Sequence, residues 1–561
     1  VAVANAALPK AGGTMTGNIA TKGITSVTLG TSNFVAGVNA GNSITSGGNY
    51  NTTIGDEAGT ALTTGGQNVA VGMNAMVGQT TASYNVAVGQ AALSANTTGA
   101  NTTAVGWNSL TANTTGASNT AVGSSALQAN TTGASNTAVG KSALEDNTTG
   151  RDNTANGFNA LATNTTGFEN AALGMFALRF NTTGNTNTAV GLQALHKNTT
   201  ASNNTAVGRN AMEANTTGES SVAIGESALL SNTTGNYNVA VGRVTLDANT
   251  TGAYNTGLGY GALSGNTTAS NNTAVGSLAL VANTTGGNNG AFGYQALDAN
   301  TTGYANNAMG FNSLGANTTG YSNSAYGHSS LDANTTGANN TAVGDNSLSA
   351  NTTAANNTAV GINAGAEIST GATNTLIGKD SGRFITTGAK NTVLGPYHGN
   401  QGGLDIRTSS NNVVLSDGDG NIKFAYENSS NTTKMPDVYT NTSGNAANVV
   451  ILSSGTICRS TSSLKYKRDV QDATHGLAEV LQLRPVTYKG KNAEDGDTVF
   501  GGLIAEEVHD AGLTEFVQYA DDETPDALAY SNMVSLCIKA IQELSTQNAA
   551  LAARLTTLEE G

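Results

Sequence analysis

A glycine recurs every seventeen residues along most of this chain, at twenty-one successive positions from Gly55 to Gly395, without an insertion or deletion. The surrounding unit reads approximately N-T-A-V-G-x-x-A-L-x-x-N-T-T-G-x-x, as in residues 119–135. A fixed short period of this kind means that one small structural unit stacks on copies of itself. The period therefore predicts a rod-like repeat domain over residues 46–395.

Two hydrophobic columns in the repeat predict a thin, continuous core. One column directly precedes the glycine and the other lies four residues after it, with small alanines beside both. The N-T-A-V-G stretch alternates as a short strand does, and the N-T-T-G stretch is typical of a turn. Together they predict a mainly-β fold, a long parallel β-solenoid with one coil per repeat. Representative core residues are expected to be Val122, Leu127, Val139, Leu144, Val190 and Leu195.

A third column consists of asparagine, from Asn96 to Asn351. Identical asparagines stacked at a rung spacing of about 4.8 Å can hydrogen-bond as a ladder, and twenty such steps would span roughly 95 Å. The pattern changes near both ends, where Gln79 replaces the asparagine and where Gly365 and Gly382 replace the leucine. These departures predict capping coils.

The repeats and the N-terminal segment each resemble known fibrous proteins. The sequence V-A-I-G at residues 222–225, with its many N-T-A-V-G counterparts, resembles the head repeats of trimeric autotransporter adhesins. Residues 8–17, L-P-K-A-G-G-T-M-T-G, resemble a short module of phage tail fibres, within a β-rich N-terminal segment over residues 1–45. The first resemblance implies a trimeric adhesive stalk or head.

The period stops at about residue 396, and residues 396–461 are expected to form a β-rich connector or tip. Residues 411–424 read as two strands around the turn D-G-D-G-N, which favours a hairpin over the alternative of a calcium loop. The glutamate expected at position twelve of such a calcium loop is missing. We therefore predict neither a metal nor a cofactor.

Charge and apolar content limit the classes of partner. The formal net charge of −14 argues against binding to nucleic acid or to an anionic membrane surface. No apolar run is long enough for a membrane span, and the N-terminal residues of the sequence do not have the basic-then-apolar pattern of a signal segment. The chain is therefore expected to be made in a host cytoplasm without membrane insertion. Cys458 and Cys537 have neither metal-site nor redox-motif spacing.

The chain ends in a helix with a heptad pattern. Hydrophobic residues alternate at spacings of three and four, which is typical of a coiled coil, and a polar residue at one core position would fix the register. The expected trimer-forming residues are Val534, Ile541, Leu544, Asn548, Leu551, Leu555 and Leu558. Cys537 occupies the heptad position between Val534 and Ile541. Fewer than four heptads are marginally stable alone, so the helix is expected to assemble with copies of itself.

Residues 462–561 resemble the intramolecular chaperone auto-processing domain of endosialidases and phage tail fibres. The resemblance rests on S-S-L-K-Y-K-R-D-V at residues 462–470, on L-x-x-R-P-V at 481–486, on G-L-I-A-E-E-V at 502–508 and on A-Y-S at 529–531. In that family the domain trimerises the fibre and then cleaves itself off.

The resemblance also implies residue roles. Ser462 corresponds to the nucleophile, Lys467 to its base, and Thr461–Ser462 to the cleaved bond. A neutral lysine can activate a serine where burial and neighbouring cations lower its pKa. Ser463 stands where the family often has aspartate, and Ser460 and Ser463 are alternative nucleophiles. Enzymatic activity is thus expected, at most, toward the chain itself, and an uncut permanent clamp is the other interpretation.

The leading interpretation is a homotrimeric phage tail fibre that binds a host surface receptor or glycan and joins other virion proteins through its N-terminus. Exposed aromatic and imidazole groups, Tyr254, Tyr304, Tyr321 and His328, are the candidate receptor contacts. The alternatives are a bacterial trimeric adhesin or spacer stalk and, more weakly, a glycan depolymerase. The last needs a paired set of carboxylates, whereas Glu145, Asp146, Glu169 and Glu226 are scattered.

Overall fold

The computed structural model describes residues 30–435, 449–451, 457–459, 468–491, 496–520 and 523–560. The chain divides into two units, residues 1–442 and residues 443–561. The motif at residues 8–17 lies outside the described residues. Among the residues that are described, no helix combines the length and the apolar character needed to cross a membrane.

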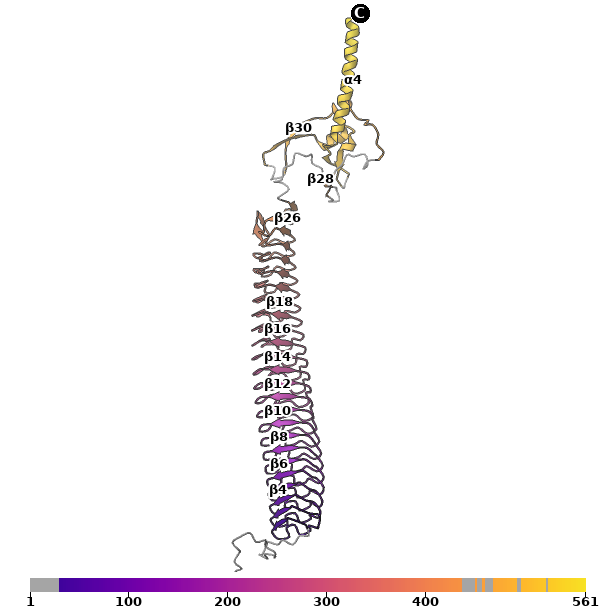
Figure 1. The fold of residues 1–561 in the computed structure, drawn as a ribbon. Helices are drawn as coiled ribbons and strands as arrows, with labels where there is room; N and C mark the ends of the chain where they lie inside the picture. The colour runs from indigo at the N-terminus through magenta and orange to yellow at the C-terminus, as the bar shows by residue number, and fades with distance from the viewer. Residues whose placement is uncertain are drawn as a thin grey trace, which may run out of the picture. The chain divides into compact units, whose positions relative to one another are not determined.

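The first unit is a β-solenoid in which each repeat contributes one three-residue strand (Figure 1). Consecutive strands from β1 to β22 pair in parallel, and from β2 to β22 each residue pairs with the residue seventeen positions later, as Thr120 does with Thr137. This confirms the mainly-β solenoid with one coil per repeat. The strands are β1 (Phe34–Ala36), β2 (Thr52–Ile54), β3 (Val69–Val71), β4 (Val86–Val88), β5 (Thr103–Val105), β6 (Thr120–Val122), β7 (Thr137–Val139), β8 (Thr154–Asn156), β9 (Ala171–Leu173), β10 (Thr188–Val190), β11 (Thr205–Val207), β12 (Val222–Ile224), β13 (Val239–Val241), β14 (Thr256–Leu258), β15 (Thr273–Val275), β16 (Gly290–Phe292), β17 (Asn307–Met309), β18 (Ser324–Tyr326), β19 (Thr341–Val343), β20 (Thr358–Val360), β21 (Thr375–Ile377) and β22 (Thr392–Leu394).

The solenoid core consists of two columns of side chains. One is the leucine four residues after the glycine, and the predicted core residues Leu127, Leu144 and Leu195 are all fully buried. The other is the middle residue of each strand, which is alanine in most repeats, such as Ala121 and Ala138. Each coil buries these side chains against the coils above and below it, so the core is continuous along the stack.

The second predicted core column is not buried, and this part of the prediction was wrong. Val122 is 38% exposed, and Val139 and Val190 are half-buried on the outer face of the strands. Side chains alternate between the two sides of a strand, so an inward-facing Ala121 places Val122 outward. The interior of a seventeen-residue coil takes alanine at this position, and the larger residue faces out.

The turn after each strand depends on backbone conformations in the left-handed region. Gly123 has φ of 141°, and a Cβ atom at this position would lie 2.4 Å from the carbonyl oxygen of Gly140 in the next coil. Leu127 has φ of 53°, which non-glycine residues seldom adopt. Its amide donates to the carbonyl oxygen of Ala143 at 3.0 Å, so contacts with the next coil hold the turn in place.

The predicted asparagine ladder is present inside the solenoid. Asn130 Nδ2 donates to Asn113 Oδ1 at 2.7 Å and to the carbonyl oxygen of Gly133 at 3.0 Å. Equivalent contacts connect the column from Asn96 to Asn351. Because both side-chain functions are used inside a narrow core, the ladder satisfies polar groups that burial would otherwise destabilise.

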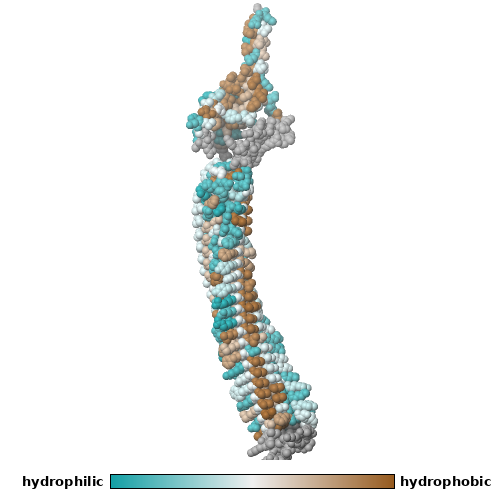
Figure 2. Space-filling model, turned by 60° about the vertical axis from the view of Figure 1, so that its left-hand side comes forward, coloured by the Kyte–Doolittle hydropathy of each residue, from teal (hydrophilic) through white to brown (hydrophobic). Residues whose placement is uncertain are grey.

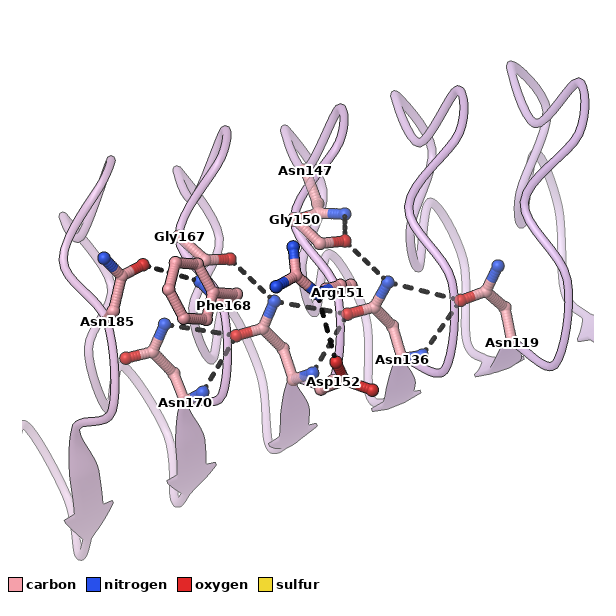
Figure 3. A network of polar contacts seen from close by, with 11 residues as sticks. Asn119, Asn136, Asn147, Gly150, Arg151, Asp152, Gly167, Phe168, Asn170 and Asn185 are labelled. Carbon is pink, nitrogen blue, oxygen red and sulfur yellow. Dashed lines mark hydrogen bonds and ion pairs between the residues drawn. The ribbon is translucent and has the colours of Figure 1, made fainter.

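A second ladder, which the sequence analysis did not predict, uses the asparagine that directly precedes most of the strands (Figure 3). The backbone amide and the Nδ2 of Asn136 both donate to Asn119 Oδ1, at 2.9 and 3.2 Å. Asn136 Nδ2 also donates to the carbonyl oxygen of Gly150 at 2.9 Å. The residue directly before each of these strands is therefore held to the preceding coil by its backbone and its side chain.

The C-terminal end of the first ladder carries a paired exchange of residues. The leucine position becomes Gly365 and the asparagine position becomes Ile368, which is fully buried. Gly382 repeats the exchange, and Gly365 and Gly382 keep positive φ values of 59° and 58°. Asn351 is the last asparagine of the ladder, and its Oδ1 atom is buried without a hydrogen-bond partner. In the next coil the corresponding residue is Ile368, which has no side-chain donor to offer. Apolar side chains therefore end the polar ladder, consistent with capping coils.

Antiparallel strands end the stack after β22. They are β23 (Asn400–Gln401), β24 (Leu404–Asp405), β25 (Val413–Ser416), β26 (Ile422–Glu427) and β27 (Thr432–Lys434). β25 continues the parallel sheet from β22 and then pairs antiparallel with β26. Between them, the Asp417 carboxylate accepts from the backbone amides of Asp419 and Asn421 at 3.1 and 2.9 Å, which confirms the predicted hairpin turn.

The second unit mixes short strands with helices. Its elements are β28 (Val449–Ile451), β29 (Ile457–Arg459), α2 (Leu477–Val480), β30 (Val486–Lys489), β31 (Val499–Gly502), α3 (Ala505–Asp510), η3 (Thr514–Phe516), β32 (Val517–Tyr519), β33 (Pro525–Leu528) and α4 (Met533–Glu559). The described strands of this unit form three separate antiparallel pairs, β28 with β29, β30 with β31 and β32 with β33. The helix predicted at the end of the chain is therefore present as α4.

Candidate functional site

The second unit has a small core at the N-terminal end of α4. Val508 from α3, Leu513 from the following loop and Leu536 from α4 are almost fully buried together. Phe516, Val517 and Met533 complete this cluster. Only the first two turns of α4 take part, since Met533, Leu536 and Ala540 are its buried residues.

Polar contacts connect distant parts of this unit. Glu543 Oε2 on α4 accepts from the backbone amide of Leu477 at 2.8 Å, across 66 residues of sequence. The Tyr530 hydroxyl accepts from the amide of Leu503 at 2.7 Å and donates to its carbonyl oxygen at 3.2 Å. These side chains thus connect separate segments of the unit by hydrogen bonds. They also provide partners for the backbone groups of Leu477 and Leu503.

Two ion pairs lie at the surface of the same unit. Arg484 pairs with Glu507 of α3, and this hydrogen bond holds the pKa of the Glu507 carboxyl below its ordinary value. His475 Nδ1 lies 2.7 Å from Glu515 Oε1, and this contact raises the pKa of His475. Both pairs are solvent-exposed, so they orient the loops more than they stabilise the fold.

The predicted coiled-coil seam of α4 is exposed in the single chain. Ile541, Leu544 and Leu551 are 66%, 45% and 60% exposed. Val534, Leu555 and Leu558 are more than half exposed as well. Next to its N-terminal half lies an open apolar groove of about 580 Å³, lined by Leu503, Met533, Ile538 and neighbouring residues. A helix with such an apolar side is unstable in water unless another surface covers it.

The predicted self-cleavage site lies outside the described residues. This holds for Thr461, Ser462 and Lys467, and for the alternative nucleophiles Ser460 and Ser463. Their roles therefore stay predictions. The described chain resumes at Arg468, whose side chain is exposed and lies 3.9 Å from Asp469.

Aromatic side chains form short stacks on the surface of the shaft. The rings of Tyr237 and Tyr254 lie 5.0 Å apart in consecutive coils, as do those of Tyr304 and Tyr321. His328 stacks on Phe311 at 5.1 Å. The in-register coils thus align rings that the sequence places seventeen residues apart. The predicted receptor contacts are brought into pairs, although their binding role is untested.

Residues 462–518 match the family described as chaperone of endosialidase. No curated protein matches the chain. The match begins at Ser462 and ends within β32, so it includes the Arg484–Glu507 pair and most of the small core. A β-solenoid that precedes a segment of this family fits a tail fibre with a C-terminal chaperone domain, as the sequence motifs predicted.

Proposed function

We propose that this chain is a homotrimeric phage tail fibre whose shaft holds or presents a receptor-binding surface and whose C-terminal unit is its folding chaperone. The observation that carries the proposal is the match to the chaperone of endosialidase over residues 462–518, in a chain whose earlier part is a long solenoid. Stacks of near-identical coils are prone to pairing out of register. A C-terminal trimeriser that aligns three chains is a physical remedy for such slips.

The chaperone function includes self-cleavage. Ser462 Oγ attacks the carbonyl carbon of Thr461, and Lys467 accepts the hydroxyl proton. The peptide C–N bond then breaks, the new amine of Ser462 takes up a proton, and an ester joins the two segments. Water hydrolyses the ester, which gives a fibre ending in the carboxylate of Thr461 and regenerates the serine hydroxyl. Burial in the assembled trimer, next to Lys465 and Arg468, would keep Lys467 neutral and so couple cleavage to assembly.

Intact-mass measurement of the wild type and of Ser462→Ala tests the cleavage. We expect a wild-type product that ends at Thr461 and a full-length Ser462→Ala chain. Ser463→Ala is the matched control and should still be cleaved. Full-length wild-type protein would contradict the cleavage and leave the second unit as a permanent clamp.

Receptor binding is assigned to the stacked aromatic groups. Flat rings held parallel, such as Tyr304 and Tyr321, offer a rigid apolar face of the kind that stacks on sugar rings. A panel of bacterial surface polysaccharides provides the probe. The double variant Tyr304→Ala/Tyr321→Ala should lose binding, and Tyr84→Ala, an exposed tyrosine in an early coil, should retain it. Equal binding by both variants would contradict this assignment, and shortening of the polysaccharide would favour a depolymerase instead.

A further inference from the structure

The outer face of the strands carries a long hydrophobic column. We call it the strand stripe and define it as the last residue of each strand from β2 to β22, directly before the repeat glycine. Twenty of these twenty-one residues are hydrophobic, and Asn156 is the exception. Ile224, Leu258 and Ile377 are each more than 40% exposed. Figure 2 shows hydrophobic surface running as a band along the stack. Such a long apolar surface is unusual on a protein that faces only water.

Charged side chains are absent from this face of the strands. None of the strands β1 to β22 contains aspartate, glutamate, lysine or arginine. Charges do occur close by, since Lys141, Glu226 and Arg243 each directly follow a repeat glycine. Depletion of charge in the centre of a hydrophobic surface is the compositional mark of a protein–protein interface.

The size of the strand stripe is sufficient for a stable interface. Thirteen of its residues are between 36% and 51% exposed and the other hydrophobic ones are half-buried, so it presents on the order of 1,000 Å² of apolar surface per chain. This area is above the roughly 800 Å² per partner of a standard interface. A partner that covers all of it must repeat with the same rise per rung. A second copy of this chain, aligned in parallel, has that property by construction.

We propose that the strand stripe is the surface through which copies of this chain pack against one another along the shaft, around a common axis. The proposal rests on the trimeric fibre proposed above and specifies which face of the shaft points to the axis. The exposed seam of α4 gives an independent reason for parallel copies, because it lies on the same chain and also lacks a cover in the single chain. Three separate solenoids would thereby share one outer hydrophobic layer, while each keeps its own alanine–leucine core.

Cysteine cross-linking of the full chain tests this arrangement. In a background where Cys458 and Cys537 are serine, Ile224→Cys places a thiol on the strand stripe, and Thr217→Cys places one on an exposed turn about half a coil away. A short thiol-to-thiol cross-linker should yield a covalent dimer of most Ile224→Cys chains, because only two of three thiols at an axis can pair. The Thr217→Cys chain should stay at least fivefold less cross-linked.

Light scattering on the same two proteins separates the possible failures. A trimer in which Ile224→Cys cross-links no better than Thr217→Cys would overturn the placement of the strand stripe and leave the trimeric fibre standing. A monomer at micromolar concentration would overturn both. A trimer with selective cross-linking at Ile224→Cys supports both.

Discussion

The shaft and the C-terminal unit solve the problem of burial in different ways. Each coil of the shaft adds a section to one continuous core, and most coils pair buried asparagines with the neighbouring coil, so each added repeat brings its own stabilising contacts. Within its described residues, the C-terminal unit has one small core, and most of the 27-residue helix α4 has its apolar side exposed. The contrast indicates that the shaft draws most of its stability from contacts between its own coils, whereas most of α4 has no cover within the described part of its own chain.

The largest expected effect is on assembly through α4. Leu551→Asp would place a carboxylate in the predicted coiled-coil seam of each chain, where three like charges cannot be solvated together. We expect loss of the trimer at micromolar concentration by light scattering, with the solenoid circular dichroism retained. Ala553→Asp, on the opposite side of the same helix, is the control and should assemble normally. A trimeric Leu551→Asp protein would mean that the shaft alone drives association.

The next effect concerns the interior of the shaft. Asn232→Ala removes the donor to Asn215 Oδ1 and to the carbonyl oxygen of Gly235, and also the acceptor for Asn249 Nδ2. Leaving these buried groups unpaired should cost about 3 kcal/mol of unfolding free energy. Hydrogen exchange should rise in the coils around residue 232 and not at β25 to β27. Thr234→Ala, an exposed turn residue, is the control, and equal exchange in the two variants would show that the ladder is dispensable.

A smaller effect follows from partly buried aspartates of the shaft. Burial raises the pKa of Asp298, so its contribution to stability is fully present below the ordinary aspartate pKa and is lost as pH rises through the raised value. Asp298→Asn should therefore unfold at a slightly higher temperature than the wild type at pH 7, and the two should converge near pH 3. Asp146→Asn, at an exposed position, should show no such gain. A wild type that is the more stable protein at pH 7 would contradict the sign.

The smallest effect is expected in the C-terminal unit. Because Glu515 raises the pKa of His475, the stabilisation is complete below the ordinary histidine pKa of about 6.5 and disappears as pH rises through the raised value. The unfolding temperature of this unit should fall slightly between pH 6 and pH 8. The fall should be absent in Glu515→Gln, measured by scanning calorimetry, and present in Glu523→Gln.

The repeat period predicted much of the shaft, because a strict spacing leaves little choice of architecture. It predicted one rung per repeat, the buried leucine column that includes Leu144, and the ladder from Asn96. It could not decide which side of a three-residue strand faces inward, since Ala138 and Val139 both suit a core. The left-handed backbone at Leu144 was also not predictable, because leucine gives no sign of it.

For the C-terminal unit, the sequence motifs predicted the family and α4 but not the contacts. Glu543 meets Leu477 across 66 residues, and Arg484 meets Glu507 across 23. Pairings at such separations are set by the tertiary fold and leave no local pattern. The proposed chemistry of Ser462 and Lys467 still depends on the motif alone.

At the end of the asparagine ladder, glycine replaces the leucine and isoleucine replaces the asparagine. This replacement also affects how the length of the shaft can change. Since interior coils are interchangeable and the closing coils are chemically distinct, whole repeats can be gained or lost between them without a new boundary having to be invented. Each such event alters the reach of the shaft by a single rung, about 4.8 Å. The length of the shaft is therefore set by the number of seventeen-residue repeats. Recombination between near-identical repeats can change that number, and so the length, in one step.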